Sequence, residues 1–316
     1  MPINNVIFMG TPQFAVPTLN LLANSRFKPI LCITQPDKPK GRKQKFQPPE
    51  VKIKARELGI AVIQPEDVNN EETIRKLQDI KPDVIVTAAY GGYLKKTIRQ
   101  LPAFGCLNLH PSLLPKYRGS APINYTLFNG DKITGNTIFR IVAKMDAGPI
   151  LLQRKINIEP SDCYTSLYQK LSEVGANDVL EVLEKIEKNE IIPIPQNHEK
   201  ATFSHKLVKE DFWLNWNESA EKIFNKVRGL AEIPGAVAAF RGNRIKIIEV
   251  EILAEKSPKN PGVILEVIKN VGLKVSTADY NIMVKRLQPA GKKIMTAHAF
   301  SLGARLGNEE KFENGF

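Results

Sequence analysis

Three side chains in the middle of the chain carry groups that could work together in catalysis. Asn108 and His110 are two residues apart, and Asp146 lies further along the chain. An Asn carboxamide offers two N–H donors without a titratable charge, which suits the stabilisation of a developing oxyanion. A His can exchange a proton near neutral pH, and an Asp beside it would complete an acid–base pair. These types and their spacing indicate a centre that combines oxyanion stabilisation with proton transfer.

The residues around this pair predict where it lies. Residues two apart on a strand point to the same face, so Asn108 and His110 are expected together on a strand that Pro111 ends. In an open parallel sheet, ligands bind beyond the carboxyl ends of the strands. His110 would then sit at the mouth of the crevice, although a His in this position can also be a structural residue that its neighbours satisfy.

Asp146 belongs to a short turn between two later apolar runs, where Gly148 is free to take a positive φ. The sheet edge could bring Asp146 to the imidazole of His110, although an Asp in a turn is more often a local cap of the backbone. Cys106 also lies near His110 and could be considered as a nucleophile. A small residue packed within the strand is the favoured interpretation of Cys106.

Apolar runs of strand length alternate with helical patterns through the first half of the chain. Strands are predicted at residues 6–9, 30–34, 61–64, 84–87, 106–110, 137–142 and 150–153. Helices are predicted from about residue 15 and near residues 49–58, 70–78, 120–128 and 166–188. This order, with continuous apolar strands, indicates an open, mostly parallel, Rossmann-like α/β sheet covered by helices on both faces.

A run with two prolines at residues 191–197 breaks the helical pattern and is typical of an extended linker. Beyond it, an amphipathic helix is predicted at residues 219–230, followed by short alternating segments between Ala236 and Leu287. Short strands at this spacing indicate a small β-barrel of the oligonucleotide-binding (OB) type. The expected organisation is an α/β domain at residues 1–189, a linker at 190–205 and an OB-like domain at 206–316.

The composition is that of an ordinary globular protein, since 42% of the 316 residues are hydrophobic and 25% are charged. A net charge of +12 favours a polyanionic partner such as nucleic acid, but it also fits a well-solvated surface. The three cysteines suit a reducing compartment and lack the spacing of a zinc site. Residues 6–9 are too short an apolar run for a signal peptide or a membrane span. We therefore expect a cytoplasmic protein with neither membrane association nor a bound metal.

The turn after the first strand, Gly10-Thr11-Pro12, tests whether the sheet binds a nucleotide. It lacks the glycine spacing of a dinucleotide-binding loop and the lysine of a phosphate-binding loop. A nucleotide cofactor is therefore not expected.

Motifs along nearly the whole chain resemble those of the methionyl-tRNA formyltransferase family. They are FMGTPQFAVP at residues 8–17, NLHPSLLP at 108–115, MDAG at 145–148, NKVRGL at 225–230 and RLQPAGKK at 286–293. The NLHPSLLP motif resembles the one shared by all formyl-tetrahydrofolate transferases. The motifs at the two ends are the ones that point to tRNA-directed members.

The resemblance implies transfer of a formyl group from 10-formyltetrahydrofolate, the donor substrate, to the α-amine of methionyl initiator tRNA. Asn108 and His110 would stabilise the tetrahedral oxyanion, and Asp146 would orient His110 and help move the proton. Neither a metal nor a nucleotide cofactor is required, and nothing demands more than a monomer. The folate site would be lined by Ser112, Leu113, Leu114 and Pro115.

The polar insertion at residues 35–49 is, on its charge alone, a solvated flexible loop. The resemblance makes it the element that enters the acceptor stem of the tRNA, with Arg42 in the family's arginine position. Basic residues on such a loop can bind phosphates, and these contacts weaken as salt rises. The expected tRNA contacts are Arg42, Lys38, Lys40, Lys43 and Lys45.

Two other functions are compatible with parts of the same pattern. A formyltransferase for a small amine, such as an amino-sugar nucleotide or glycinamide ribonucleotide, would keep the same centre without needing the basic insertion or the basic barrel. A non-catalytic RNA-binding protein on an inactive transferase scaffold would be expected to have lost Asn108, His110 or Asp146, and all three are present.

Overall fold

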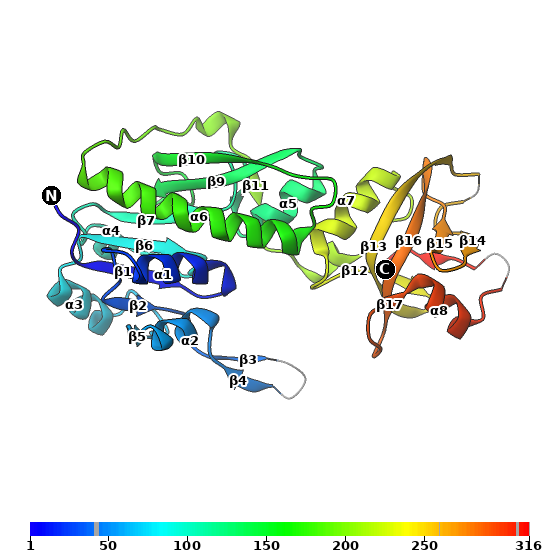
Figure 1. Ribbon diagram of the computed structural model, residues 1–316, viewed down its shortest axis with the longest axis horizontal. Coiled ribbons are helices and arrows are strands. Elements are labelled where there is room, and N and C mark those ends of the chain that lie inside the picture. The colour runs from blue at the N-terminus through cyan, green and yellow to red at the C-terminus, as the bar shows by residue number, and fades with distance from the viewer. Residues whose placement is uncertain (41–43, 259, 308–309, 316) are drawn as a thin grey trace. The chain divides into compact units, whose positions relative to one another are not determined.

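The computed structural model describes residues 1–40, 44–258, 260–307 and 310–315 (Figure 1). Contacts divide the chain into two units, each with its own sheet and its own hydrophobic core. Unit 1 consists of the segments Met1–Pro122, Ile133–Asn157 and Tyr168–Ser204. Unit 2 consists of the segments Ile123–Lys132, Ile158–Leu167 and His205–Phe316.

Unit 1 contains a seven-stranded sheet with the order β10-β9-β7-β6-β1-β2-β5. The strands from β7 to β5 are parallel, and β9 and β10 are added antiparallel beside β7. This arrangement confirms the predicted Rossmann-like, mostly parallel sheet. The strands are β1 (Val6–Gly10), β2 (Leu31–Ile33), β5 (Ala61–Ile63), β6 (Val84–Ala88), β7 (Cys106–His110), β9 (Ile133–Arg140) and β10 (Ile150–Asn157).

Helices cover both faces of this sheet, which explains why its central strands are continuous apolar runs. On one face, Leu77 of α3 and Ile98 of α4 join a core with alternate residues of the strands. On the other face α6 packs closely against β7, because a Cβ atom added at Gly175 would lie 2.7 Å from the side chain of Leu109. The helices are η1 (Gln13–Ala15), α1 (Val16–Ala23), α2 (Glu50–Glu57), α3 (Glu71–Ile80), α4 (Lys96–Arg99) and α6 (Tyr164–Glu187).

Most predicted elements of this unit begin and end within a few residues of the observed ones, and β7 matches its prediction at both ends. The strand predicted at residues 137–142 is an exception, since β9 begins earlier, at Ile133. Polar residues lie around this start, with Asn136 just before the predicted beginning and Thr137 at it. Both are buried and hydrogen-bonded inside the protein: the Asn136 amide donates to the Leu171 carbonyl at 2.9 Å, and the Thr137 hydroxyl donates to the Ser112 carbonyl at 2.6 Å.

The basic insertion contains a β-hairpin, so the prediction of a flexible loop was wrong for its paired part. β3 (Lys38–Lys40) pairs antiparallel with β4 (Lys45–Gln47). Because the side chains of β4 are exposed, no alternation of apolar and polar residues marks the ribbon in the sequence. Pro39 is tolerated because a two-stranded ribbon has free edges that need no backbone donor.

The segment predicted as a linker is extended, but it also makes specific contacts within unit 1. Ile194 and Ile150 exchange backbone hydrogen bonds of 2.8 Å each. Further along, β11 (Phe203–Ser204) pairs in parallel with β8 (Arg118–Gly119), which belongs to the loop after β7. A single 3-10 turn, η2 (His198–Lys200), lies between these contacts. The segment therefore borders the carboxyl end of β7.

Unit 2 contains an antiparallel sheet with the order β14-β15-β16-β13-β12-β18, and β17 pairs with β16. The sheet curls until its edges meet, since Val263 bridges Lys311 and the Ile264 N–H donates to the Glu310 carbonyl at 2.8 Å. The predicted small β-barrel is confirmed. Its strands are β12 (Ala236–Phe240), β13 (Asn243–Lys256), β14 (Ile264–Ile268), β15 (Gly272–Val275), β16 (Tyr280–Pro289), β17 (Met295–Thr296) and β18 (Phe312–Glu313).

An aromatic core and short helices complete unit 2. Trp216 and Phe312 stack with ring centroids 5.3 Å apart, and the Ser219 hydroxyl caps α7 by accepting a hydrogen bond from the Lys222 N–H. The helix α8, capped by Thr296, was not predicted. Among the described residues, no helix has the length and apolarity that a membrane span requires. The helices are α5 (Pro122–Phe128), η3 (Lys209–Phe212), α7 (Ala220–Leu230) and α8 (Ala297–Ala304).

Candidate active site

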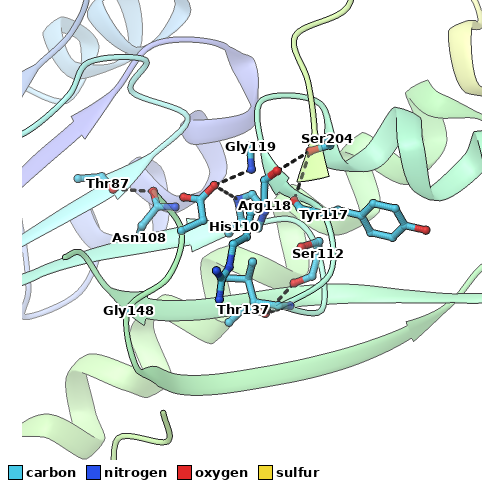
Figure 2. Close-up of polar contacts among 12 residues, drawn as sticks. Thr87, Asn108, His110, Ser112, Tyr117, Arg118, Gly119, Thr137, Gly148 and Ser204 are labelled. Carbon is cyan, nitrogen blue, oxygen red and sulfur yellow. Dashed lines mark hydrogen bonds and ion pairs between the residues drawn. The ribbon is translucent and has the colours of Figure 1, made fainter. Parts of the chain in front are cut away.

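The carboxyl end of β7 places Asn108 and His110 on the same face of the sheet, as predicted (Figure 2). Asn108 is paired with Thr87 of β6, and His110 is paired with Thr137 of β9. The strand ends immediately after His110, at Pro111. The two functional side chains therefore occupy the edge at which open α/β sheets bind their ligands.

The carboxamide of Asn108 is held by its neighbour in the sheet. The Thr87 hydroxyl donates to the Asn108 Oδ1 atom at 2.6 Å (Figure 2). This bond occupies the carbonyl end of the carboxamide and orients its amide end. Within the part of the chain that the structure describes, the Asn108 amide nitrogen donates no hydrogen bond. Asn108 thus presents fixed N–H donors in a partly exposed position.

The imidazole of His110 is buried, with 4% of the residue exposed, and is oriented by the main chain of the following loop. Its Nε2 atom lies 2.9 Å from the carbonyl oxygen of Tyr117. Because a carbonyl oxygen only accepts hydrogen bonds, Nε2 carries a hydrogen. The other nitrogen, Nδ1, faces Asp146 at 3.9 Å from the Oδ2 atom. That separation is longer than a hydrogen bond, so the contact is electrostatic.

Asp146 reaches the centre from the turn between β9 and β10. The Gly119 N–H donates to the Asp146 Oδ2 atom at 2.8 Å, which fixes the carboxylate beside His110. The prediction that the same sheet edge would bring Asp146 to His110 is confirmed.

The backbone of this turn differs from the expectation. The positive φ, 49°, falls on Asp146 and not on Gly148. Gly148 is needed for a different reason, because a Cβ atom there would lie 1.8 Å from the Arg140 carbonyl oxygen. The glycine lets the turn approach β9, and Asp146 itself takes the left-handed conformation that non-glycine residues adopt rarely.

Hydrogen bonds within the loop after β7 and to the neighbouring strand β9 fix the conformation of this loop. The Ser112 hydroxyl donates to the Lys116 carbonyl at 2.7 Å, and the Leu114 N–H donates to the Thr137 hydroxyl at 3.1 Å. Ser112 and Leu114 are buried, whereas Leu113 and Pro115 are partly exposed. The first two residues therefore maintain the shape of the loop, and the last two have surface available to a ligand.

A buried polar cluster next to Asp146 was not predicted from the sequence. Arg118 is 1% exposed, and its guanidinium donates to the Oε1 atom of Gln196 at 2.6 Å and 3.2 Å. Burial lowers the pKa of Arg118, and the negative charge of Asp146 opposes that shift. The one usable signal was the length of the segment at residues 190–204, because long connections without regular structure are often functional.

Cys106 precedes Asn108 by two residues on β7, but it has the properties of a core residue. It is 1% exposed, its thiol donates weakly to the Ile98 carbonyl at 3.8 Å, and burial raises its pKa to about 12. The thiol is thus neutral at physiological pH, which supports the interpretation of Cys106 as a packed residue. Of the other histidines, His198 and His205 are exposed, and the His198 Nδ1 atom accepts a hydrogen bond from the Arg118 guanidinium at 3.0 Å.

The hairpin carries part of the predicted tRNA-contacting set, and Lys38 and Lys45 are exposed on it. Its base is fixed to the sheet edge by Asp37, whose carboxylate accepts hydrogen bonds from Lys52 at 2.8 Å and Gln64 at 2.7 Å. Both bonds hold the pKa of Asp37 below its usual range. Lys40 contributes its backbone to β3, and Arg42 and Lys43 lie outside the described residues.

Residues 4–183 match the formyl transferase family, and residues 206–305 match the formyl transferase C-terminal domain. Methionyl-tRNA formyltransferase of Thermodesulfovibrio yellowstonii is 45% identical over 96% of this chain and 97% of that protein. The enzyme of the same name from Thermotoga neapolitana is 40% identical over 98% and 99%.

The chain belongs to the methionyl-tRNA formyltransferase family. It is an enzyme of formyl transfer, as the motifs predicted. Solved structures of other proteins have a similar fold. The sugar 3-N-formyltransferase WlaRD, determined in the presence of dTDP and 5-N-formyl-tetrahydrofolate, superimposes with a TM-score of 0.68 at 19% identity, over 93% of this chain and all of that one (100%).

Among the described residues, no three His, Cys, Asp or Glu side chains come together in a way that could hold a metal ion.

Proposed function

We propose that this family member transfers the formyl group of 10-formyltetrahydrofolate to the α-amine of methionyl initiator tRNA, and that Asn108, His110 and Asp146 carry out the transfer. The observation that carries the proposal is the combination of relatives of this name along the whole chain with an oriented Asn–His–Asp cluster at the sheet edge. The initiator tRNA and the folate donor are its two partners. We also propose that the enzyme is a monomer and that it acts in the cytoplasm.

In the proposed reaction, the neutral α-amine attacks the formyl carbon and forms a C–N bond while the formyl oxygen becomes an oxyanion. The amide N–H groups of Asn108, which the Thr87 hydroxyl orients, donate to that oxygen. Collapse re-forms the carbonyl and breaks the bond to N10 of the folate. The amine loses a proton and N10 gains one, so atoms and charge balance.

His110 is proposed to help stabilise the oxyanion, and His110 and Asp146 are proposed to transfer the proton together. Since the Tyr117 carbonyl fixes the hydrogen on Nε2, the Nδ1 atom is the one that can exchange a proton on the side of Asp146. The Asp146 carboxylate, held by the Gly119 N–H, favours an imidazolium transiently formed at that position. The pair can therefore pass the proton from the incoming amine towards N10, directly or through a water.

The donor is proposed to bind against the loop after β7. The partly exposed Leu113 and Pro115 offer apolar surface, while Ser112 and Leu114 keep the loop in shape. These four residues thus serve the folate site in two ways, by contact and by support. A flat heteroaromatic ring is suited to such a rigid, largely apolar wall.

The tRNA is proposed to contact the hairpin and the β-barrel. Lys38 and Lys45 are exposed on a ribbon with a fixed base, and Lys40, Arg42 and Lys43 belong to the same basic insertion. Phosphate contacts by such residues would make binding weaken with salt. In this proposal residues 1–189 form the catalytic domain, 190–205 connect it to the rest, and 206–316 form the tRNA-binding domain.

The test is formyl transfer to methionyl initiator tRNA in comparison with free methionine and with amino-sugar nucleotides at matched concentrations. Rapid formylation of the charged tRNA, with little product from the other amines, is the expected result. Formylation of an amino sugar with the tRNA ignored would overturn the proposal. The likeness to sugar formyltransferases, at 19% identity, concerns the fold alone and does not favour that outcome.

A further inference from the structure

One buried carboxamide joins the catalytic turn to the loop after β7. Gln196 is 6% exposed and lies in the extended segment at residues 190–204. Its Nε2 atom donates to the main-chain carbonyls of Asp146 at 2.9 Å and Gly148 at 2.7 Å. Its Oε1 atom accepts two bonds from the Arg118 guanidinium. Both ends of the carboxamide are therefore used, and both lead to residues next to the proposed centre.

The bonds to the turn matter because Asp146 has a conformation that needs support. A φ of 49° lies in the left-handed region, which a non-glycine residue adopts at a cost in conformational energy. Rotation about the N–Cα bond of Asp146 would relieve that cost, but it would turn the Asp146 carbonyl and carboxylate together. The two carbonyls accept from one amide nitrogen, so Gln196 fixes their relative orientation and opposes the rotation.

The bonds to Arg118 fix Gln196 in turn. Arg118 is the residue that precedes Gly119, whose N–H binds the Asp146 carboxylate. Gln196 and Gly119 thus hold Asp146 by its main chain and by its side chain, from two neighbouring points on one scaffold. The same segment reaches His110 through Ser204, whose hydroxyl donates at 3.3 Å to the Tyr117 carbonyl that also accepts from the imidazole.

A purely structural role would also explain a buried, fully bonded Gln, since buried polar groups are generally satisfied. The two roles make different demands. A structural Gln contributes to stability, whatever residue occupies position 146. A Gln that sets the position of the Asp146 carboxylate affects the rate only while that carboxylate is present.

We propose that Gln196 is a positioning residue for formyl transfer, which acts on the rate by holding Asp146 in its left-handed conformation beside His110. The proposal rests on the role proposed above for Asp146. It also gives the segment at residues 190–204 a part in catalysis in addition to its connecting role.

The first experiment compares Gln196→Glu and Gln196→Leu with the wild type. Gln196→Glu keeps an oxygen for Arg118 but replaces the donor that faces the two carbonyls, so it is the variant best able to keep the fold. We expect kcat to fall by about ten- to a hundred-fold, as for other displacements of catalytic groups by about 1 Å. KM for donor and tRNA should stay near the wild-type values. Gln78→Leu removes an exposed carboxamide on α3 and should leave kcat unchanged.

The second experiment is a double-mutant cycle with Asp146→Asn. If Gln196 acts through the Asp146 carboxylate, adding Gln196→Glu to Asp146→Asn should lower kcat by less than about two-fold, because coupled residues are not additive. Equal losses in both backgrounds, or a wild-type kcat for Gln196→Glu, would overturn the positioning role. Near-normal turnover of Asp146→Asn alone would instead remove Asp146 from the proposed centre, so the two failures are distinguishable.

Discussion

The carboxyl end of β7 and the β3–β4 hairpin belong to the same unit, but they carry their functional groups in different ways. At the end of β7, Asn108 and His110 are oriented by single hydrogen bonds from Thr87 and to Tyr117, and His110 is buried while Asn108 is partly exposed. On the hairpin, Lys38 and Lys45 are exposed, and the fixed contacts lie at the base of the ribbon.

The difference indicates two ways of contributing to one reaction. Donors that their neighbours hold in place are suited to transition-state stabilisation, because their orientation costs nothing during the reaction. Exposed cations on a ribbon are suited to a polyanion, because their attraction reaches over several ångströms and tolerates small displacements. Changes at β7 should therefore lower kcat, and changes at the hairpin should raise KM for tRNA.

The largest effect is expected from Asn108→Ala. Loss of one oxyanion donor lowers turnover by about 10²–10³-fold in enzymes of this kind. Neither KM should change much, because the donors act on charge that develops in the transition state. Single-turnover formylation at saturating donor and tRNA measures the change directly. A rate within a few-fold of the wild type would show that another group stabilises the oxyanion.

A smaller effect of the same kind is expected from Thr87→Val. Valine fills the same space but cannot donate to the Asn108 carbonyl, so the amide loses its fixed orientation. We expect kcat to fall by about ten-fold, corresponding to about 1.4 kcal/mol, the value of an ordinary hydrogen bond. The matched comparison is Thr87→Val in the Asn108→Ala background, where the second substitution should have little further effect on kcat.

The β7 end could be predicted from the sequence because its determinants are local. The strand-length segment at residues 106–110, the two-residue spacing of Asn108 and His110, and Pro111 are all visible in the chain. A period of two requires that both side chains share a face. Asp146 was placed correctly for a related reason, since its turn joins two strands of the same sheet.

The contacts of Gln196 and the pairing of the hairpin could not be predicted in this way. Gln196 is hydrogen-bonded to Asp146 and Arg118, which lie 50 and 78 positions away in the sequence, and no periodic pattern predicts such distant partners. The hairpin hides no apolar face, so its pairing leaves no alternation of residues to detect. At Gly148 the residue type was informative, but the cause, close approach to Arg140, depends on a neighbouring strand.

On the hairpin, the double variant Lys38→Ala/Lys45→Ala should raise KM for tRNA several-fold and leave kcat and the donor KM unchanged. If both lysines contact phosphates, the slope of log KM against log salt should flatten by about 1–2, since each contact contributes roughly 0.7–0.9. Lys76→Ala/Lys96→Ala removes the same charge from exposed sites on α3 and α4 and serves as the control. Equal effects of the two double variants would indicate general electrostatic attraction instead of a hairpin contact.

The smallest effect is expected from Cys106→Ala, which tests whether the β7 end works without a covalent intermediate. Cys106 points to the same face as Asn108 and His110, but burial raises its pKa to about 12 and its thiol faces Ile98. A neutral, buried thiol is a poor nucleophile, so kcat should change by less than about two-fold. The lost methylene-sized volume should lower the melting temperature slightly. A hundred-fold loss of turnover in a folded variant, or a formyl group trapped on the protein by acid quenching, would mean that a covalent step replaces direct attack. If neither is observed, the end of β7 contributes through the fixed orientation of Asn108 and His110, whereas the hairpin contributes through the charge of its lysines.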